Sequence, residues 1–179
     1  MEYAEIKDGP ITLTIDYDEC AESPREWDNL GTMVCWHDKY VLGDKHYFDE
    51  PQSFYNEVHN DNAIILPLYL YDHSGITIST GPFACMWDSG PVGYIYVTKD
   101  QVRQEYGAKR ISQKLRDRVI NVLINEIETF DMYIKGECFS YLIMDGEHFI
   151  DSCSGFYGDD WNQMKVQTEK EYQYLFDEL

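Results

Sequence analysis

The chain has 179 residues and a mass of 21.1 kDa, and its 33 acidic residues outnumber 14 basic ones for a formal net charge of −19 at pH 7. Because 44% of the residues are apolar and 15% are aromatic, the composition excludes an acidic disordered tail and predicts one folded domain over 1–179. The longest apolar run, about 63–70, is far shorter than the ~20 residues of a membrane helix, and residues 1–10 lack signal-peptide features, so we expect a cytoplasmic protein without a membrane partner.

Residues 11–98 are dominated by short segments of alternating or β-branched residues, a pattern that predicts strands. The predicted strands cover residues 11–17, 32–36, 63–71, 76–79 and 92–97. Asp72-His73-Ser74-Gly75 has the composition of a hairpin turn between two of them. Asp49-Glu50-Pro51 predicts the start of a short helix that runs to His59, because proline favours the first helical turn.

Two helices are predicted after residue 97. Thr98 and Gln101 follow the pattern of a capping box, which begins a short helix that Gly107 ends. Apolar residues then recur at spacings of three, four and seven over about 112–131, which predicts the longest helix. Its basic residues lie near the N-terminal end and its acidic residues near the C-terminal end, both against the helix dipole. We therefore expect these charges to serve another purpose, such as pairing with neighbours.

The C-terminal part is predicted to add a hairpin and a helix. Strands over 132–144 and 148–154 flank Asp145-Gly146, a strong two-residue turn signal, and 159–179 is acidic and favours helix. The predicted fold class is α+β. It has a mainly antiparallel sheet of about six strands packed against one long helix over about 112–131, plus short helices.

No motif in the chain identifies a catalytic or cofactor site. The sequence has no P-loop and no dinucleotide-binding glycine motif. Its acidic pairs do not follow the spacing of a calcium-binding loop, and His37 and His46 lack the nearby cysteine pair of a structural zinc site. The five cysteines form no Cys-x-x-Cys pair, which in a reducing compartment predicts mostly buried free thiols. We therefore assign no catalytic residue, no cofactor and no metal, and favour a protein that is not an enzyme.

Two Trp-Asp pairs, Trp27-Asp28 and Trp87-Asp88, lie in predicted loops. An indole beside a carboxylate can form one wall of a ligand site. Alternatively, each Trp covers the edge of the core while its Asp caps a turn. If the pairs converge with the predicted turn, they form a pocket for a small ligand such as a nucleotide signal, or the site of a hydrolase. The residues of this alternative pocket are Trp27, Asp28, Asp72, His73, Trp87 and Asp88.

Four segments of the chain resemble a family of proteins encoded in bacteriophages, plasmids and their Gram-positive hosts. They are residues 24–33 with the sequence PREWDNLGTM, 71–77, 87–90 and 151–153. The resemblance extends from about residue 11 to 160 and implies a mobile-element origin, but no activity and no functional residue. Some members carry a Cys-x-x-Cys insert in the final hairpin, where this chain has the tight Asp145-Gly146 turn, so the resemblance implies no zinc site here.

The charge pattern provides the leading hypothesis for function. Seven of the 14 basic residues lie between Lys99 and Arg118 among three acidic ones, so this segment has a formal net charge of +4. The remaining chain has seven basic and 30 acidic residues, a net of −23. Six acids within 13 residues form a candidate partner-binding strip: Asp16, Asp18, Glu19, Glu22, Glu26 and Asp28. Such a field repels nucleic acid and attracts the basic groove of an enzyme that binds it.

With a mobile-element origin, this pattern predicts an acidic inhibitor of a host nucleic-acid-handling defence enzyme, either an anti-CRISPR protein or an antirestriction protein. The inhibitor would act in the host cytoplasm by occupying a basic groove of its partner as a DNA mimic, without binding nucleic acid itself. The sequence leaves open the small-ligand pocket described above and a structural or assembly role. A surface that is merely acidic and soluble explains the charge nearly as well.

Overall fold

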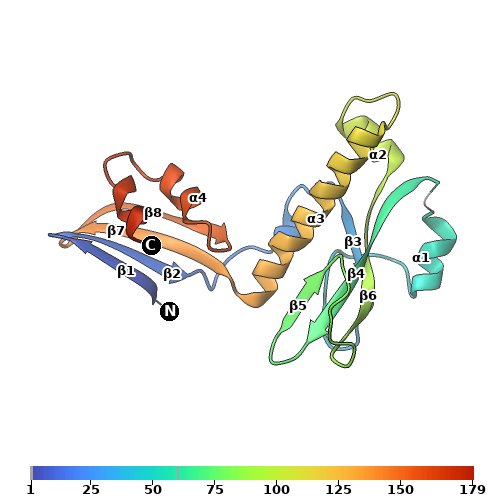
Figure 1. Cartoon of the computed structure of the whole chain (residues 1–179), viewed down its shortest axis with the longest axis horizontal. Coiled ribbons are helices and arrows are strands. Elements are labelled where there is room, and N and C mark those ends of the chain that lie inside the picture. The colour runs from blue at the N-terminus through green and yellow to red at the C-terminus, as the bar shows by residue number, and fades with distance from the viewer. Residues whose placement is uncertain (1, 60) are drawn as a thin grey trace. The chain divides into compact units, whose positions relative to one another are not determined.

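The structure is a computed structural model that describes residues 2–59 and 61–179, which form two antiparallel sheets and several helices (Figure 1). The predicted α+β class is confirmed, whereas one sheet of about six strands against a single long helix is not, because eight strands form two sheets of four. Contacts group the residues into two compact units, one up to Ser23 together with Met132–Leu179 and one over Pro24–Asp131. One domain over 1–179 stays a prediction, and each unit is described by itself.

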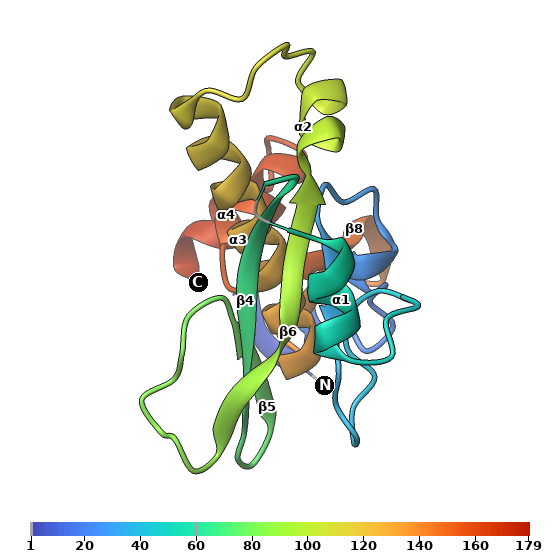
Figure 2. The same ribbon diagram turned by 90° about the vertical axis from the view of Figure 1, so that its right-hand side faces the viewer.

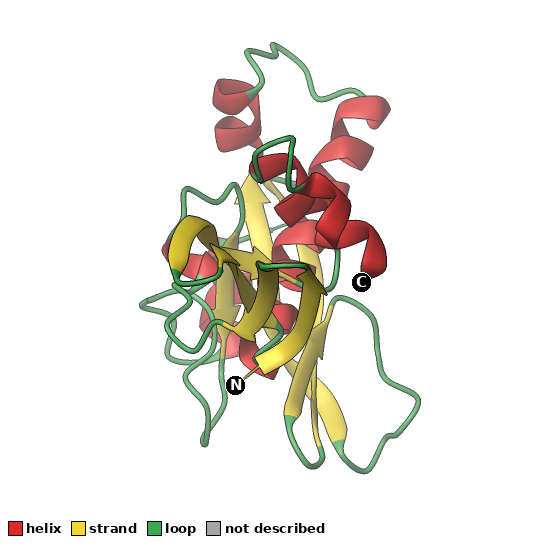
Figure 3. Ribbon diagram, turned by 90° about the vertical axis from the view of Figure 1, so that its left-hand side faces the viewer, coloured by secondary structure: helices red, strands yellow, loops and turns green. Residues whose placement is uncertain are grey.

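The first unit contains a sheet with the strand order β1-β2-β7-β8 (labelled in Figure 1), and its strands face the viewer in Figure 3. The strands are β1 (Glu2–Asp8), β2 (Ile11–Tyr17), β7 (Cys138–Asp145) and β8 (His148–Tyr157). The hairpin predicted around Asp145-Gly146 is confirmed as the β7–β8 connection. β1 was not predicted, because it is an edge strand in which four of the seven residues are charged.

One face of this sheet is covered by α4 (Trp161–Gln167) and the 3-10 helix η2 (Gln173–Glu178), so the predicted C-terminal helix is two short ones. Met164, Leu175 and Phe176 pack against the inward-facing residues of two central strands. Those strand residues are Leu13, Ile15, Phe139, Tyr141 and Ile143. Their alternation with more exposed residues is typical of a sheet that is covered on one face.

The second unit contains a sheet with the strand order β3-β6-β4-β5 (Figure 2). The strands are β3 (Thr32–Cys35), β4 (Ala63–Asp72), β5 (Ile76–Ser79) and β6 (Ser89–Thr98). The helices are η1 (Pro24–Glu26), α1 (Pro51–Glu57), α2 (Lys99–Glu105) and α3 (Gln113–Lys135). In Figures 1 and 2, α1 lies on one face of the sheet and α3 on the other, so both faces are covered.

Alternate residues of β6 pack on the two faces of the sheet. Tyr94 packs against Phe54 of α1 with its ring stacked at 5.2 Å between centroids, while Ile95 points to Leu123 of α3, since both would contact a methyl group placed on Gly31. The buried residues of α3 are Val119, Leu123, Ile127 and Phe130, as the predicted apolar face requires.

The start of α2 and the end of α3 can be compared directly with the sequence predictions. The capping box of α2 is confirmed, because Thr98 Oγ1 accepts a hydrogen bond from Gln101 N at 3.2 Å. The long helix was predicted to end at residue 131 but continues to Lys135, and β7 begins at Cys138, so the strand predicted from residue 132 is wrong over its first six residues. Gly136, with φ 73°, ends the helix, because glycine adopts this left-handed conformation without a steric cost.

The raised pKa values of two tyrosines lead us to expect that the protein loses stability at alkaline pH. Burial raises the pKa of Tyr94 and of Tyr141 to about 12. The unfolded chain loses these protons from about pH 10 and the folded protein keeps them, so stability falls as pH rises from about 10 to 12. We expect Tyr141→Phe to make this loss smaller, as measured by the urea midpoint at a series of alkaline pH values. Equal losses for the variant and the wild type would contradict the assignment.

The cysteines differ from the sequence prediction. All five are free, but only Cys138 is buried, and Cys20 and Cys153 are exposed, so the prediction of mostly buried thiols is wrong. Burial raises the pKa of Cys35 to about 12 and that of Cys138 to about 11, which keeps both thiols protonated at neutral pH. Among the helices described, none combines the length and apolar character needed to cross a membrane.

Candidate functional site

A buried arginine fixes the segment Pro24–Gly31. The side chain of Arg25 is 5% exposed, and its Nε and Nη2 donate to the two carboxylate oxygens of Asp44 at 2.9 and 2.7 Å. Its Nη1 donates to Glu126 Oε2 at 3.1 Å. Burial alone would lower the pKa of Arg25, but hydrogen bonds and charges from Asp44 and Glu126 raise it above its ordinary value. The second residue of the PREWDNLGTM motif is therefore a structural anchor.

Glu126 ties the same segment to α3. Its Oε1 accepts hydrogen bonds from Leu30 N at 2.9 Å and from Gly31 N at 3.2 Å. Arg25 Nη2 also donates to Gly31 O at 2.7 Å, so both polar groups of this glycine are bonded. The backbone of residues 30 and 31 is thus held against the helix.

Asp131 makes a similar connection farther along α3. Its Oδ1 accepts from Thr77 Oγ1 at 2.6 Å and from Ile78 N at 2.7 Å, both on β5. Like Glu126, it is an acid in the C-terminal half of this helix that anchors a neighbouring segment. The expectation that these charges have another use is confirmed for these two residues.

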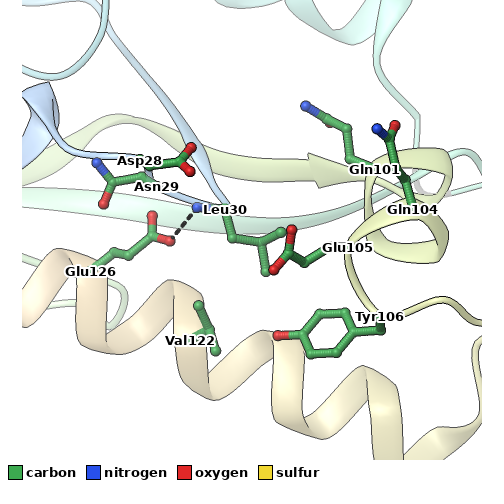
Figure 4. Close-up of a pocket in the computed structure, with 9 residues that line it drawn as sticks. All are labelled: Asp28, Asn29, Leu30, Gln101, Gln104, Glu105, Tyr106, Val122 and Glu126. Carbon is green, nitrogen blue, oxygen red and sulfur yellow. Dashed lines mark hydrogen bonds between the residues drawn. The ribbon is translucent and has the colours of Figure 1, made fainter.

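A groove opens between the anchored segment, the end of α2 and the middle of α3 (Figure 4). It has a volume of about 720 Å³. Its lining residues, which define the groove below, are Asp28, Asn29, Leu30, Gln101, Gln104, Glu105, Tyr106, Val122 and Glu126. A smaller hollow of about 210 Å³ shares Asn29, Val122 and Glu126 with it and adds Pro24, Trp27, Asn125 and Thr129. Both belong to the second unit.

The groove contains two exposed carboxylates that form no ion pair with a described side chain. Asp28 and Glu105 are exposed, and neither carboxylate forms an ion pair within the part of the chain that the structure describes. They come from the anchored segment and from α2, and Leu30 and Val122 lie beside them (Figure 4). Glu126 is committed to Arg25 and to the backbone. This arrangement can hold a cationic group that has an aliphatic stem.

The predicted acidic strip is divided between the two units. Asp16, Asp18, Glu19 and Glu22 belong to the first unit, and Glu26 and Asp28 to the second. Asp18 has a structural role, because its carboxylate accepts hydrogen bonds from Cys20 N and Gly155 N, each at 3.1 Å. Glu19, Glu22, Glu26 and Asp28 are exposed, and Glu22, Glu26 and Asp28 form no ion pair within the described residues.

The alternative ligand pocket is not one site. Trp27 and Asp28 line the smaller hollow and the groove, whereas Asp72, Trp87 and Asp88 line a different depression of about 350 Å³. His73 lies beside the latter, with its Nδ1 3.6 Å from Asp88 Oδ2.

Two of these residues are poorly suited to a ligand wall. Asp72 accepts hydrogen bonds from Lys39 Nζ at 3.2 Å and Tyr40 Oη at 3.1 Å, and the Lys39 contact lowers the pKa of its carboxyl. Trp87 is 95% exposed, so its indole does not cover the edge of the core.

The basic segment 99–118 spans α2, the connection to α3 and the first turns of α3, at one end of the β3-β6-β4-β5 sheet (Figure 2). Its exposed basic residues are Arg103, Lys109, Arg110, Lys114 and Arg118. Arg118 lies over the Tyr106 ring at 5.1 Å from its centroid. The ion pair of this segment, Arg103 with Asp100, stays inside it, and over residues 2–59 and 61–179 no other ion pair involves its basic side chains.

Sequence reasoning found Asp28 but missed the other charged and aromatic residues of the groove. Glu105 and Tyr106 lie at the end of a short helix, and nothing in their local sequence indicates that they line the same groove as Asp28. Glu126 was indicated only indirectly, by its unfavourable position in the helix dipole. Within the described ranges, no three His, Cys, Asp or Glu side chains are grouped so that they could hold a metal ion. Comparison with protein-family models, curated proteins and solved structures gives no match to this chain.

Proposed function

We propose that this protein inhibits a host nucleic-acid-handling defence enzyme, a CRISPR effector or a restriction enzyme, by occupying its basic groove in place of the nucleic acid. The proposal combines the charge of the chain with the mobile-element origin that the resemblance implies. In this role the protein binds the host enzyme through exposed carboxylates and does not bind nucleic acid itself.

The separation of charge supports this proposal. Half of the basic side chains lie in one segment, and the described ion pairs of that segment stay within it. The exposed acids Glu22, Glu26 and Asp28 form no ion pair with a basic side chain among the described residues. No described ion pair therefore joins the basic segment to these three acids.

The expected interaction depends strongly on salt. A polyanion bound in a basic groove is stabilised mainly by charges at the surface, and these are screened within a Debye length of about 8–10 Å at physiological ionic strength. Complementary charges also accelerate association, so raising the salt concentration should slow binding more than it speeds dissociation.

The test is a cleavage assay with purified CRISPR effectors and restriction enzymes of Gram-positive hosts on a fixed DNA substrate. We expect stoichiometric inhibition of one class of enzyme, which weakens when the salt concentration rises from about 50 to 200 mM and is overcome by excess DNA. Asp88→Asn and His73→Ala should leave inhibition unchanged. Inhibition that these two substitutions abolish, or that excess DNA does not relieve, would contradict groove occupation.

A further inference from the structure

We propose that the groove and the adjoining hollow together receive a short basic and apolar segment of the partner protein, with an arginine side chain between Asp28 and Glu105. The inference rests on the proposed function, because it names the chemistry by which a basic partner is held. It names one specific recognition site, the groove defined above.

The two halves of the site differ in chemistry. Asp28 and Glu105 give the groove a negative charge, and the apolar residues that line the adjoining hollow are Pro24, Trp27 and Val122. Trp27 is 45% exposed, so a large part of its indole is available for contact. A ligand that fills both halves must carry a positive group and an apolar group a few ångströms apart, as two neighbouring residues of a peptide do.

The polar groups of the groove favour arginine over lysine. Carboxylates approach from two elements (Figure 4), and a planar guanidinium offers five N–H donors that can satisfy both of them, whereas an ammonium is a point charge with three donors. The side-chain amide of Gln104 provides a further acceptor at the same wall. Leu30 and Val122 lie where the aliphatic stem of an arginine would pass (Figure 4).

The groove is formed before any partner arrives. Arg25 and Glu126 hold the backbone of Leu30 and Gly31 against α3, and Arg118 covers one face of the Tyr106 ring. Because these contacts fix both walls, little conformational entropy is lost when a ligand binds. The apolar contact with Trp27 then adds affinity of the kind that aromatic residues give at protein interfaces.

The experiment is an NMR titration of the 15N-labelled full chain with the dipeptide acetyl-Leu-Arg-amide. The matched probe is acetyl-Leu-citrulline-amide, which has nearly the same shape but no charge. We expect the arginine peptide to shift the backbone amides of residues 27–30 and 104–106 in a saturable manner, and the citrulline peptide to shift them at least about tenfold more weakly, equivalent to ~1.4 kcal/mol.

Two pairs of substitutions distinguish the effect of the groove carboxylates from the effect of the net charge. Asp28→Asn with Glu105→Gln should weaken the arginine peptide at least about tenfold, whereas Glu147→Gln with Glu169→Gln, which removes the same charge from exposed sites elsewhere, should not. Equal shifts with the citrulline peptide, or equal weakening by both pairs of substitutions, would overturn the inference.

A failure of this inference can be distinguished from a failure of the proposed function. If the arginine peptide binds the groove but no defence enzyme is inhibited, the site is correct and the proposed target is wrong. If inhibition persists unchanged in the Asp28→Asn, Glu105→Gln protein, the decoy function stands and the groove is not its recognition site.

Discussion

Replacing Arg25 with alanine should lower the free energy of unfolding by about 3–5 kcal/mol. The substitution leaves Asp44 and Glu126, whose side chains are 22% and 11% exposed, without their cationic partner. It also removes a hydrogen bond to Gly31 O and weakens the attachment of the segment to α3. Urea denaturation followed by tryptophan fluorescence measures the loss.

Two further variants control this prediction. Arg103→Ala removes an exposed arginine that pairs with Asp100 on the same helix, and should cost less than about 0.5 kcal/mol. Arg25→Lys keeps the charge but loses the planar fork that contacts Asp44 at two oxygens, so its loss should be intermediate. A loss for Arg25→Ala no larger than that for Arg103→Ala would show that this buried network does not stabilise the fold.

Reversing three exposed acids of the strip should weaken inhibition by at least about 100-fold, or ~3 kcal/mol. The variant is Glu19→Lys with Glu22→Lys and Glu26→Lys, which leaves the groove carboxylates intact. A lysine that faces the basic groove of the partner replaces attraction with like-charge repulsion, which costs several kcal/mol across an interface. The inhibition constant in the cleavage assay provides the measurement.

The matched control is Glu147→Lys with Glu169→Lys and Glu178→Lys, which changes the net charge by the same amount at other exposed positions. If these acids contact the partner, this control should weaken inhibition less than about tenfold. Comparable losses in both triple variants would mean that net charge alone, and not a particular surface, carries the effect.

Local patterns predicted most secondary structure, because hydrophobic periodicity and capping act over a few residues. The α2 cap and the buried face of α3 are examples. The division into two four-stranded sheets was not predictable in this way, since strand pairing between β2 and β7 joins residues more than 120 positions apart. The end of the long helix has a local signal, because Gly136, directly after Lys135, adopts the left-handed conformation that ends it.

The candidate site was less accessible to sequence reasoning than the fold. Asp28 belongs to both predicted sites, the acidic strip and the alternative pocket with Trp27, and it lines the groove. Its neighbours in space come from α2 and α3, roughly 75 to 100 positions later in the sequence, where only tertiary contacts can place them. The most distinctive motif of the chain, PREWDNLGTM, contains Arg25, whose bonds are internal. A conspicuous motif can therefore hold a loop in place without itself binding a ligand.

The most direct test of the account measures the affinity of this protein for the inhibited enzyme with and without a saturating duplex that carries the target sequence. Mutually exclusive binding, seen as an apparent dissociation constant that rises in proportion to the duplex concentration, is the predicted result. Binding of equal affinity to the free enzyme and to the enzyme–DNA complex would contradict occupation of the nucleic-acid groove.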